Sequence, residues 1–378
     1  MLDHRIRIIL AFVLHASSTG GLHVRLPEIQ AALGISEAVY GLVLLGMPAG
    51  VLFGSLLSPG QIERFGPRRV MALGLVMATA LQILAALAPN AASLAAMMAV
   101  YGVFFACTNV SINVEANRFE TRHAARIMSL CHGWWALGFL ATSLLAAGCI
   151  RLGASPLVQF TAHAAIMVAL TATLVLPMPD SGTPGQPQAH RRFAIPTRGV
   201  VLIGLWALAG ILLEGATRGW IVIYLRDALG AAEDLAALAL PAVVLTQTGG
   251  RFVADALIAR YGVVTVARVS SVLLGVGIGV LAGAPTVPIA LLGCLLVGGG
   301  FAITMPQGFA AAGRRPERPP TETVASFATL ATMIGFVGPP LFGLLAETIG
   351  LRAAFALLLP VTFVSVAMAG CLNPTRSG

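Results

Sequence analysis

A glutamate and an arginine stand one helical turn apart in a long apolar stretch of this sequence. Glu214 is followed by Arg218 at position i+4 within the run 200–224, which contains no other acidic residue. A Glu–Arg pair at this spacing can neutralise both charges on one helix face. A carboxylate in an apolar environment can also take up and release a proton. Glu214 is therefore either half of an ion pair that only balances charge or a proton-coupling site.

Histidines and an indole form a second group of candidates. His15, Thr19 and His23 are spaced by four residues, so they share one face of a helix. Imidazoles on an inward face could relay protons or bind a polar solute, or they could be packed among other side chains. His132 and Trp135 are three residues apart and could form an imidazole and an aromatic wall on one face, although Trp135 could equally belong to the core.

Uncharged amides make the third group. Asn109, Asn113 and Asn117 form a stripe at i, i+4, and Gln247 and Gln307 lie in later apolar runs. Amides suit a hydroxylated or otherwise neutral polar ligand, although they could also join helices to each other. The predicted substrate-binding residues are thus His15, Thr19, Asn109, Asn113, His132, Trp135, Gln247 and Gln307.

Helices that cross a membrane must position these side chains. The chain has 378 residues, of which 57% are hydrophobic and 10% are charged, and its mean hydropathy is +0.89. Soluble domains contain about 25% charged residues. A helix needs about 20 apolar residues to span a bilayer. Twelve runs qualify: 6–26, 39–58, 70–88, 92–114, 127–148, 157–176, 200–224, 237–257, 266–282, 287–310, 326–346 and 353–371.

Glycines at every fourth position predict where these helices approach each other closely. One series is Gly46, Gly50 and Gly54, and another is Gly275, Gly279 and Gly283. Small residues at this spacing allow close contact between helices in lipid.

The arginines predict which side of the membrane each loop faces. All 23 basic residues are arginines, and most of them lie in loops on the side that holds both termini. The opposite loops hold Arg25, Arg151, Arg226 and Arg352. Because arginine-rich loops stay in the cytoplasm, we expect a multi-pass protein of the inner (cytoplasmic) membrane with both termini in the cytoplasm.

The sequence also contains an internal repeat, with two copies of one unit. Ile62–Gly66 returns as Ile258–Gly262, an offset of 196 residues, and the same offset relates Gly54 to Gly250. A repeat on this scale bears on the whole fold, because each copy is expected to form the same set of helices.

The repeat predicts an N-terminal six-helix half at 1–176 and a C-terminal six-helix half at 199–378. The stretch 177–198 is rich in proline, glycine, glutamine and arginine, and we expect a flexible cytoplasmic linker there. Six helices per copy is an even number, so both copies insert the same way round, related by an axis along the membrane normal. Folds of this kind hold their substrate near the membrane midplane, between the halves.

A charged loop follows the second helix of each copy. The first copy contributes Gly60, Glu63, Arg64, Gly66, Arg68 and Arg69, and the second contributes Arg251, Asp255 and Arg260. We expect Arg251 and Asp255 to form an ion pair near the cytoplasmic exit. Charges at helix ends interact with the helix dipole, and arginines in a short loop also fix the topology.

Twelve helices in two halves, with a loop of the form Gly-x-x-acid-Arg-x-Gly-x-Arg-Arg, resemble the major facilitator superfamily. More narrowly, Arg25–Gly34, Tyr224–Gly230 and Gly338–Gly343 are similar to a bacterial branch of permeases loosely related to sugar permeases such as the fucose permease. The resemblance implies a transporter whose charged loop is a gating latch that holds one of two transport states. This chain has Asn109 and Gly219 where that branch often carries an acid.

The leading hypothesis is a secondary active transporter that moves a small polar solute, such as a sugar, by alternating access. It would work in symport with protons, through Glu214. The alternatives are a drug or metabolite efflux pump and a transporter-like sensor without flux.

Other classes of protein lack their sequence signatures here. The chain has no GxxxxGK[ST] loop and no lysine, which argues against ATP-driven transport. It has neither HExxH nor GxSxG, so we do not expect an enzyme. Its arginines lie in short loops rather than in one basic patch, which argues against nucleic-acid binding. We expect a monomer in the lipid bilayer, with a small-molecule substrate, no cofactor and no metal site.

Overall fold

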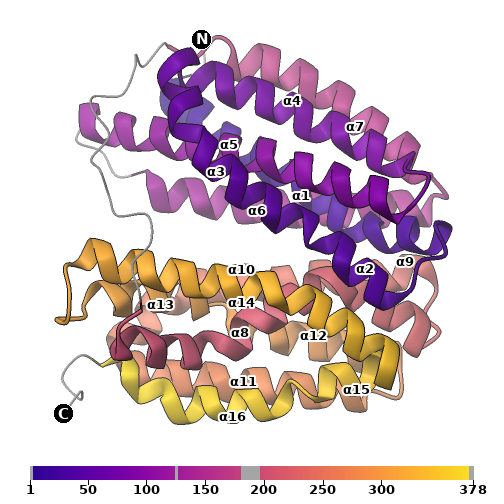
Figure 1. Cartoon of the computed structure of the whole chain (residues 1–378), viewed down its shortest axis with the longest axis vertical. Coiled ribbons are helices and arrows are strands. Elements are labelled where there is room, and N and C mark those ends of the chain that lie inside the picture. The colour runs from indigo at the N-terminus through magenta and orange to yellow at the C-terminus, as the bar shows by residue number, and fades with distance from the viewer. Residues whose placement is uncertain (1–2, 124–126, 180–195, 374–378) are drawn as a thin grey trace. The chain divides into compact units, whose positions relative to one another are not determined.

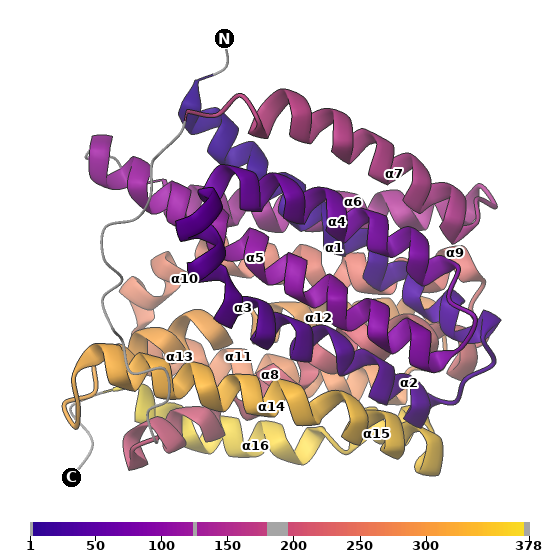
Figure 2. The ribbon, with the colours of Figure 1, turned by 45° about the horizontal axis from the view of Figure 1, so that its top comes forward.

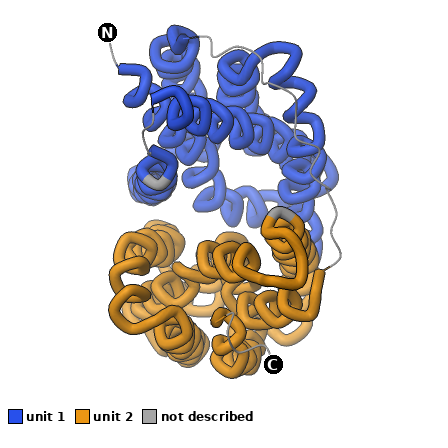
Figure 3. The backbone as a smooth tube through the Cα atoms, turned by 90° about the vertical axis from the view of Figure 1, so that its left-hand side faces the viewer, with its two compact units in different colours: residues 1–187 blue, residues 188–378 orange. Residues whose placement is uncertain are grey.

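The computed structural model describes residues 3–123, 127–179 and 196–373, and every element in these ranges is helical (Figure 1). The all-helical fold expected from the apolar runs is therefore confirmed. The chain divides into two compact units, unit 1 at Met1–Pro187 and unit 2 at Gln188–Gly378 (Figure 3). Most of the linker predicted at 177–198 lies outside the described residues.

Unit 1 contains the helices α1 (His4–Ala32), α2 (Glu37–Leu44), α3 (Gly46–Phe65), α4 (Pro67–Ala86), α5 (Ala91–His123), α6 (Met128–Arg151) and α7 (Pro156–Leu170), and the π-helical turn η1 (Thr171–Val175). Unit 2 contains α8 (Arg198–Ile223), η2 (Tyr224–Ala228), α9 (Glu233–Ala236), α10 (Ala239–Tyr261), α11 (Val263–Gly283), α12 (Val287–Phe301), α13 (Thr304–Gly313), α14 (Pro320–Ile349), α15 (Leu351–Ala356), α16 (Leu359–Met368) and η3 (Ala369–Leu372).

Within the described residues, eleven helical segments are long and apolar enough to cross a membrane. The twelfth expected span is α1, a continuous helix of 29 residues. Helix α1 is not among these eleven segments because histidine, serine and threonine side chains interrupt its apolar run. These are the same polar residues that mark α1 as a candidate for function.

Three of the expected spans are each divided into two helices, and in a fourth case the short helix α9 precedes the span formed by α10. The breaks separate α2 from α3, α9 from α10, α12 from α13, and α15 from α16. Each break lies within about one helical turn before a proline, at Pro48, Pro241, Pro306 and Pro360 respectively. Proline has no N–H for the carbonyl four residues earlier, and its ring crowds that carbonyl. The breaks therefore have a local cause, and each one leaves a carbonyl group free to bind another donor.

Hydroxyl side chains begin several helices. Ser36, Ser155 and Thr197 precede α2, α7 and α8, and each side chain accepts a hydrogen bond from the backbone N–H three residues later. Such N-caps satisfy donors that the first helical turn leaves without a partner.

Six glycines with positive φ mark equivalent turns in the two units. The pairs are Gly34 and Gly230, Gly66 and Gly262, and Gly153 and Gly350. Gly66 has φ 78° and ψ 153°, and Gly262 has φ 80° and ψ 150°. Side chains other than hydrogen are strained in this region, so the loop after the second span has the same glycine-dependent geometry in both units.

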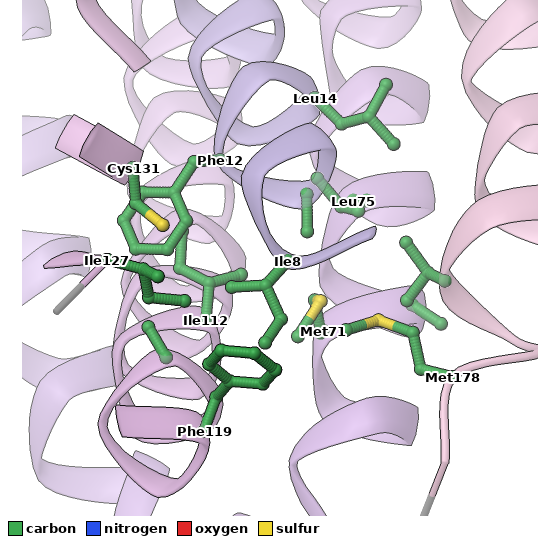
Figure 4. Packing of buried hydrophobic residues seen from close by; sticks show 14 of the residues in the cluster. Ile8, Phe12, Leu14, Met71, Leu75, Ile112, Phe119, Ile127, Cys131 and Met178 are labelled. Carbon is green, nitrogen blue, oxygen red and sulfur yellow. The ribbon is translucent and has the colours of Figure 1, made fainter. Parts of the chain in front are cut away.

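The core of unit 1 lies where α1, α4, α5 and α6 meet. Figure 4 shows Ile8 of α1 beside Met71 of α4 and Phe119 of α5, and Phe12 of α1 beside Cys131 of α6. These side chains are buried, with Phe12 fully inaccessible. This packing holds the polar face of α1 in a fixed position against its neighbours.

The glycine series of α3 packs directly on α5, and Figures 1 and 2 show these two helices side by side. A Cβ at Gly46, Gly50 or Gly54 would collide with backbone atoms of α5. The series Gly275, Gly279 and Gly283 on α11 differs, because a Cβ at the last two would meet nothing within 4 Å. A Cβ at Gly275 would approach Thr362 of α16, so all three glycines of the first series but only the first of the second series lie at an interface.

Candidate functional site

Charged and polar side chains of unit 2 meet between α8 and α10. Glu214 and Arg218 lie one turn apart on α8, with 2.7 Å between Glu214 Oε1 and Arg218 Nη2. Gln247 on α10 is buried and donates from Nε2 to the same Oε1 across 3.1 Å. One carboxylate oxygen therefore receives donors from two helices. The Glu214 and Arg218 side chains remain 20% and 33% exposed, so packing does not seal the pair.

Arg251 lies one turn beyond Gln247 on α10 and adds a second guanidinium. Its Nε donates to the carbonyl oxygen of Ala302 across 3.4 Å. This carbonyl stands at the break between α12 and α13, where Pro306 has no N–H to offer it. Arg251 is also close enough to Glu214 for their charges to attract each other. Glu214, Arg218, Gln247 and Arg251 are called the Glu214 cluster below.

The predicted ion pair between Arg251 and Asp255 is wrong. In the described part of unit 2 no ion pair joins these two side chains, and Asp255 is exposed. The spacing allowed the pair, but Arg251 turns instead toward the carbonyl oxygen of Ala302, which the break before Pro306 leaves available. Arg251 is therefore part of the Glu214 cluster rather than half of a surface pair.

His15 in unit 1 is held from three sides. Trp135 Nε1 donates to His15 Nδ1 across 2.9 Å, and His15 Nε2 lies 3.1 Å from the carbonyl oxygen of Phe105. The indole N–H can only donate, so Nδ1 must accept and the ring proton sits on Nε2. The ring also stacks on Phe105 with 4.1 Å between centroids. The structure thus brings His15 and Trp135 together, in a neutral link between α1, α5 and α6.

The other members of the histidine stripe hydrogen-bond to each other. Thr19 Oγ1 lies 3.2 Å from His23 Nδ1, which is also 3.0 Å from the carbonyl oxygen of Thr19. Both side chains are buried. His132 on α6 lies apart from this pair, with its ring edge-on to Phe12 at 5.3 Å between centroids.

The asparagine stripe lines an open hollow on unit 1. Asn109, Asn113 and Asn117 of α5 share this hollow, of about 620 Å³, with Arg118 and Met128. Asn113 Nδ2 donates to the backbone oxygen of Asn109 across 2.8 Å, so part of its capacity is used within the helix. The remaining amide groups face a space large enough for a small polar molecule.

Gln307 lies half-buried on α13, one residue after Pro306. Among the described residues, no hydrogen bond joins its side chain to the Glu214 cluster. The structure therefore places Gln247, but not Gln307, in direct contact with Glu214.

The charged loop has the same construction in both units. Arg64 lies over the ring of Phe65 with 5.1 Å to the centroid, and Arg260 lies over Tyr261 with 5.3 Å. Gly60, Glu63 and Arg69 are exposed around this turn. Arg68 instead donates from Nη1 to the carbonyl oxygen of Met178 across 2.8 Å. Arg68 thus ties the start of α4 to the segment that follows η1.

An apolar hollow lies beside the charged loop in each unit. In unit 1 it has a volume of about 460 Å³ and is lined by residues of α3, α4 and α5 that include Phe65 and Arg69. In unit 2 a hollow of about 440 Å³ is lined by Tyr261 and Thr265, which stand at the same positions after the offset of 196 residues. The repeat therefore extends from the backbone turns to the surface features around them.

A buried arginine on α1 was not predicted from the sequence. Arg25 was expected in a loop, but it lies within α1 and is 1% exposed. It donates to Gln159 Oε1 across 2.7 Å and to the carbonyl oxygen of Ala154 across 2.6 Å, and it forms an ion pair with Glu28. The available signal was the i, i+3 spacing of Arg25 and Glu28, together with a glutamine in an otherwise apolar run.

Comparison with known proteins is consistent with this geometry. A family model described as Major Facilitator Superfamily matches residues 8–335 and also 211–377. An uncharacterised transporter of Sinorhizobium fredii is 28% identical over 346 residues, covering 91% of this chain and 91% of that protein. An uncharacterised transporter of the same type from Yersinia pestis is 25% identical over 347 residues, covering 92% of this chain and 90% of its own.

Solved structures share the fold over nearly the whole length. A mutant of the nucleoside transporter NupG has a TM-score of 0.77 at 16% identity, covering 98% of this chain and 99% of its own. A D-xylose–proton symporter has a TM-score of 0.76 at 15% identity, covering 99% of this chain and 98% of its own. At these identities the likeness concerns the arrangement of helices.

Proposed function

Because the chain belongs to the major facilitator superfamily, we propose that it carries a small polar solute across the cytoplasmic membrane in symport with protons. Transport would proceed by alternating access between two states. The observation that carries the proposal is the Glu214 cluster, in which a carboxylate within a membrane span is held by donors from two helices.

Glu214 is the acid best placed to carry a proton through the membrane. The chain has 15 acidic residues, and Glu214 is the one nearest the middle of a span, at Arg198–Ala228. The other acids among the described residues lie in loops or nearer the ends of their helices. Ionisable groups inside the membrane are costly and are therefore retained mainly for function.

Protonation of Glu214 would change how α8 is joined to α10. The ionised carboxylate accepts charge-assisted hydrogen bonds from Arg218 and Gln247 through one oxygen. A proton on Glu214 removes the negative charge, so the ion pair with Arg218 is lost and the link across the two helices weakens. A proton can thereby favour one of two states of this helix pair.

The polar amides support a polar rather than a lipophilic solute. Asn109 and Asn113 line the hollow on unit 1, and Gln247 lies in the Glu214 cluster. His15, Thr19, His132, Trp135 and Gln307 complete the proposed set of substrate-binding and positioning residues. The two fold neighbours named above act on nucleosides and on D-xylose with protons, which supports the choice of test compounds.

We also propose two six-helix halves at 1–176 and 199–378, a linker between them and a cytoplasmic position for both termini. The charged loop is proposed to act as a latch that holds one of the two transport states, and the matching turns at Gly66 and Gly262 support this role.

The test is uptake by purified protein in liposomes, driven by an inward proton gradient. The panel contains sugars, nucleosides, sugar acids, amino acids and lipophilic cations. Glu214→Gln should abolish gradient-driven accumulation and retain exchange of solute between the two sides, because the amide is neutral in every state. Glu233→Gln is the matched control, since Glu233 is exposed at the start of α9.

Accumulation by Glu214→Gln equal to that of the parent protein would refute coupling through Glu214. Flux of lipophilic cations alone would favour an efflux pump instead. Binding of a compound without flux of any compound would favour the sensor.

A further inference from the structure

The interior of unit 2 holds more positive than negative charge. The Glu214 cluster contains two guanidiniums, Arg218 and Arg251, and a single carboxylate. Both arginines stay charged under physiological conditions, because a guanidinium cannot be deprotonated in a protein. With Glu214 ionised, the cluster has a net charge of about one positive unit.

The helices packed against α8 and α10 do not supply the missing negative charge. Neither α11, α12, α13 nor α16 contains an aspartate or a glutamate. Glu322 and Glu347 stand in the first and last turns of α14, far along the helix from its middle. Asp227 of η2 forms an ion pair with Arg226, Glu233 at the start of α9 is exposed, and Asp255 on α10 is exposed without an ion pair to Arg251.

An uncompensated guanidinium inside a membrane protein is costly unless a counter-charge arrives with a ligand. Among the described residues, the hydrogen bond of Arg251 goes to the neutral carbonyl of Ala302 at 3.4 Å, which is long, and the nearby carboxylate of Glu214 already forms an ion pair with Arg218. The planar guanidinium matches a carboxylate better than it matches a hydroxyl group.

We infer that the transported solute is a small hydroxylated carboxylate, whose anionic group binds Arg251 and Arg218 in exchange for the carboxylate of Glu214. This inference rests on the proposed transport function and specifies its substrate class. The amide of Gln247, released by Glu214 in the same exchange, is available to a hydroxyl group of the solute.

The exchange couples the proton to the anion. A proton that binds Glu214 cancels one negative charge, and the solute carboxylate restores it beside the same arginines. One proton and one monovalent anion therefore enter together. The net charge of the Glu214 cluster with its bound proton and anion equals that of the empty cluster. Transport of an acid by this route moves no net charge, whereas symport of a neutral sugar with a proton moves one positive charge.

The experiment compares sugar acids with their neutral parents in liposomes that contain the full chain and a trapped pH dye. The pairs are D-glucuronate with D-glucose and D-galacturonate with D-galactose. The expected result is acidification of the lumen and uptake for the acids without an electrical current, and neither signal for the neutral sugars.

Variants test the role of the arginines. Arg251→Gln should raise the KM for the acid about tenfold or more, since a hydrogen bond to a charged group is lost. Arg251→Lys should recover part of that loss because it restores the charge. Arg268→Gln, at an exposed position on α11, is the control and should leave KM unchanged. Thermal unfolding of each variant shows whether it is folded, and Arg218→Gln provides a second test if Arg251→Gln is not.

The outcomes separate the two proposals. Current-generating uptake of neutral sugars, without uptake of the acids, overturns the anion inference and leaves proton symport standing. Uptake of the acids with an unchanged KM in Arg251→Gln and Arg218→Gln also overturns the inference. If no compound is transported and none raises the unfolding temperature, both proposals fail.

Discussion

His15 illustrates how a polar side chain inside a membrane helix can be fully satisfied. Both ring nitrogens have partners, one in Trp135 on α6 and one in the backbone of Phe105 on α5. A solute can reach a ring nitrogen only after one of these bonds breaks. The geometry therefore favours a positioning role for His15, and the open amides of Asn109 and Asn113 are better placed for direct contact.

The hydrogen bond from Trp135 should contribute measurably to stability. Trp135→Phe retains an aromatic ring but leaves the buried Nδ1 of His15 without a donor. An unsatisfied buried polar atom costs about 1–3 kcal/mol, so the unfolding temperature of the purified protein should fall. Trp134→Phe is the control, because Trp134 is 45% exposed on the same helix. Equal unfolding temperatures for the two variants would contradict a structural role for this bond.

At the scale of elements, close contact between helices depends on which glycines face a neighbour. Gly50 on α3 lies against Ala99 and Gly102 of α5, whereas Gly279 on α11 faces open space. The two glycine series have the same spacing, so the sequence pattern cannot separate them. Gly277, which lies outside the second series, is the residue of α11 that packs on Val297 of α12.

Gly50→Ala should destabilise the protein more than Gly279→Ala. A Cβ at Gly50 would collide with the carbonyl of Ala99, and a backbone atom cannot move aside as a flexible side chain can. Overpacking of this kind costs about 1–3 kcal/mol. Thermal unfolding of the two variants in detergent measures the difference. A fall of the same size in both would show that α3 and α5 separate easily.

The breaks within the spans also have a local cause, which is a nearby proline. The proline before which α12 ends was visible in the sequence, and so was the loss of one helical hydrogen bond. That Arg251 would bind the released carbonyl of Ala302 was not visible, because the two residues are 51 positions apart. A proline within an apolar run therefore indicates where a carbonyl acceptor can become available without identifying its donor.

At the scale of the whole molecule, two units repeat the same turns. The three pairs of positive-φ glycines occur at offsets of 196 or 197 residues, and matching apolar hollows lie beside the charged loops. The two copies differ, however, in their charged residues. The second copy has Ala259 in place of Glu63 but keeps Arg260 in the loop, and it has a Glu–Arg ion pair within α8, at Glu214 and Arg218.

The arginine distribution predicts the orientation of the chain in the membrane. In a background without the native cysteines, Leu152→Cys should react with a membrane-impermeant maleimide added to whole cells. Leu152 is 85% exposed in the turn between α6 and α7, which is expected outside. Glu317→Cys, in the exposed turn between α13 and α14, should react only after the cells are opened. The reverse pattern of labelling would contradict the predicted topology.

The sequence by itself determined the features that depend on neighbours along the chain. The length of a span follows from the thickness of the bilayer, and the pairing of Glu214 with Arg218 follows from one helical turn. Glycine-dependent turns at Gly66 and Gly262 likewise depend on a few adjacent residues. All of these could be predicted from composition, spacing and the repeat.

Only the tertiary structure decided which faces meet. Gln247 reaches Glu214 from 33 positions away, and Trp135 reaches His15 from 120 positions away. Arg25 proved to be buried, and Arg251 turned from Asp255 to Ala302. The physical reason is that the packing of whole helices sets these contacts. The rotation of a helix about its axis depends on all of its neighbours at once, and a single spacing along the chain does not specify it.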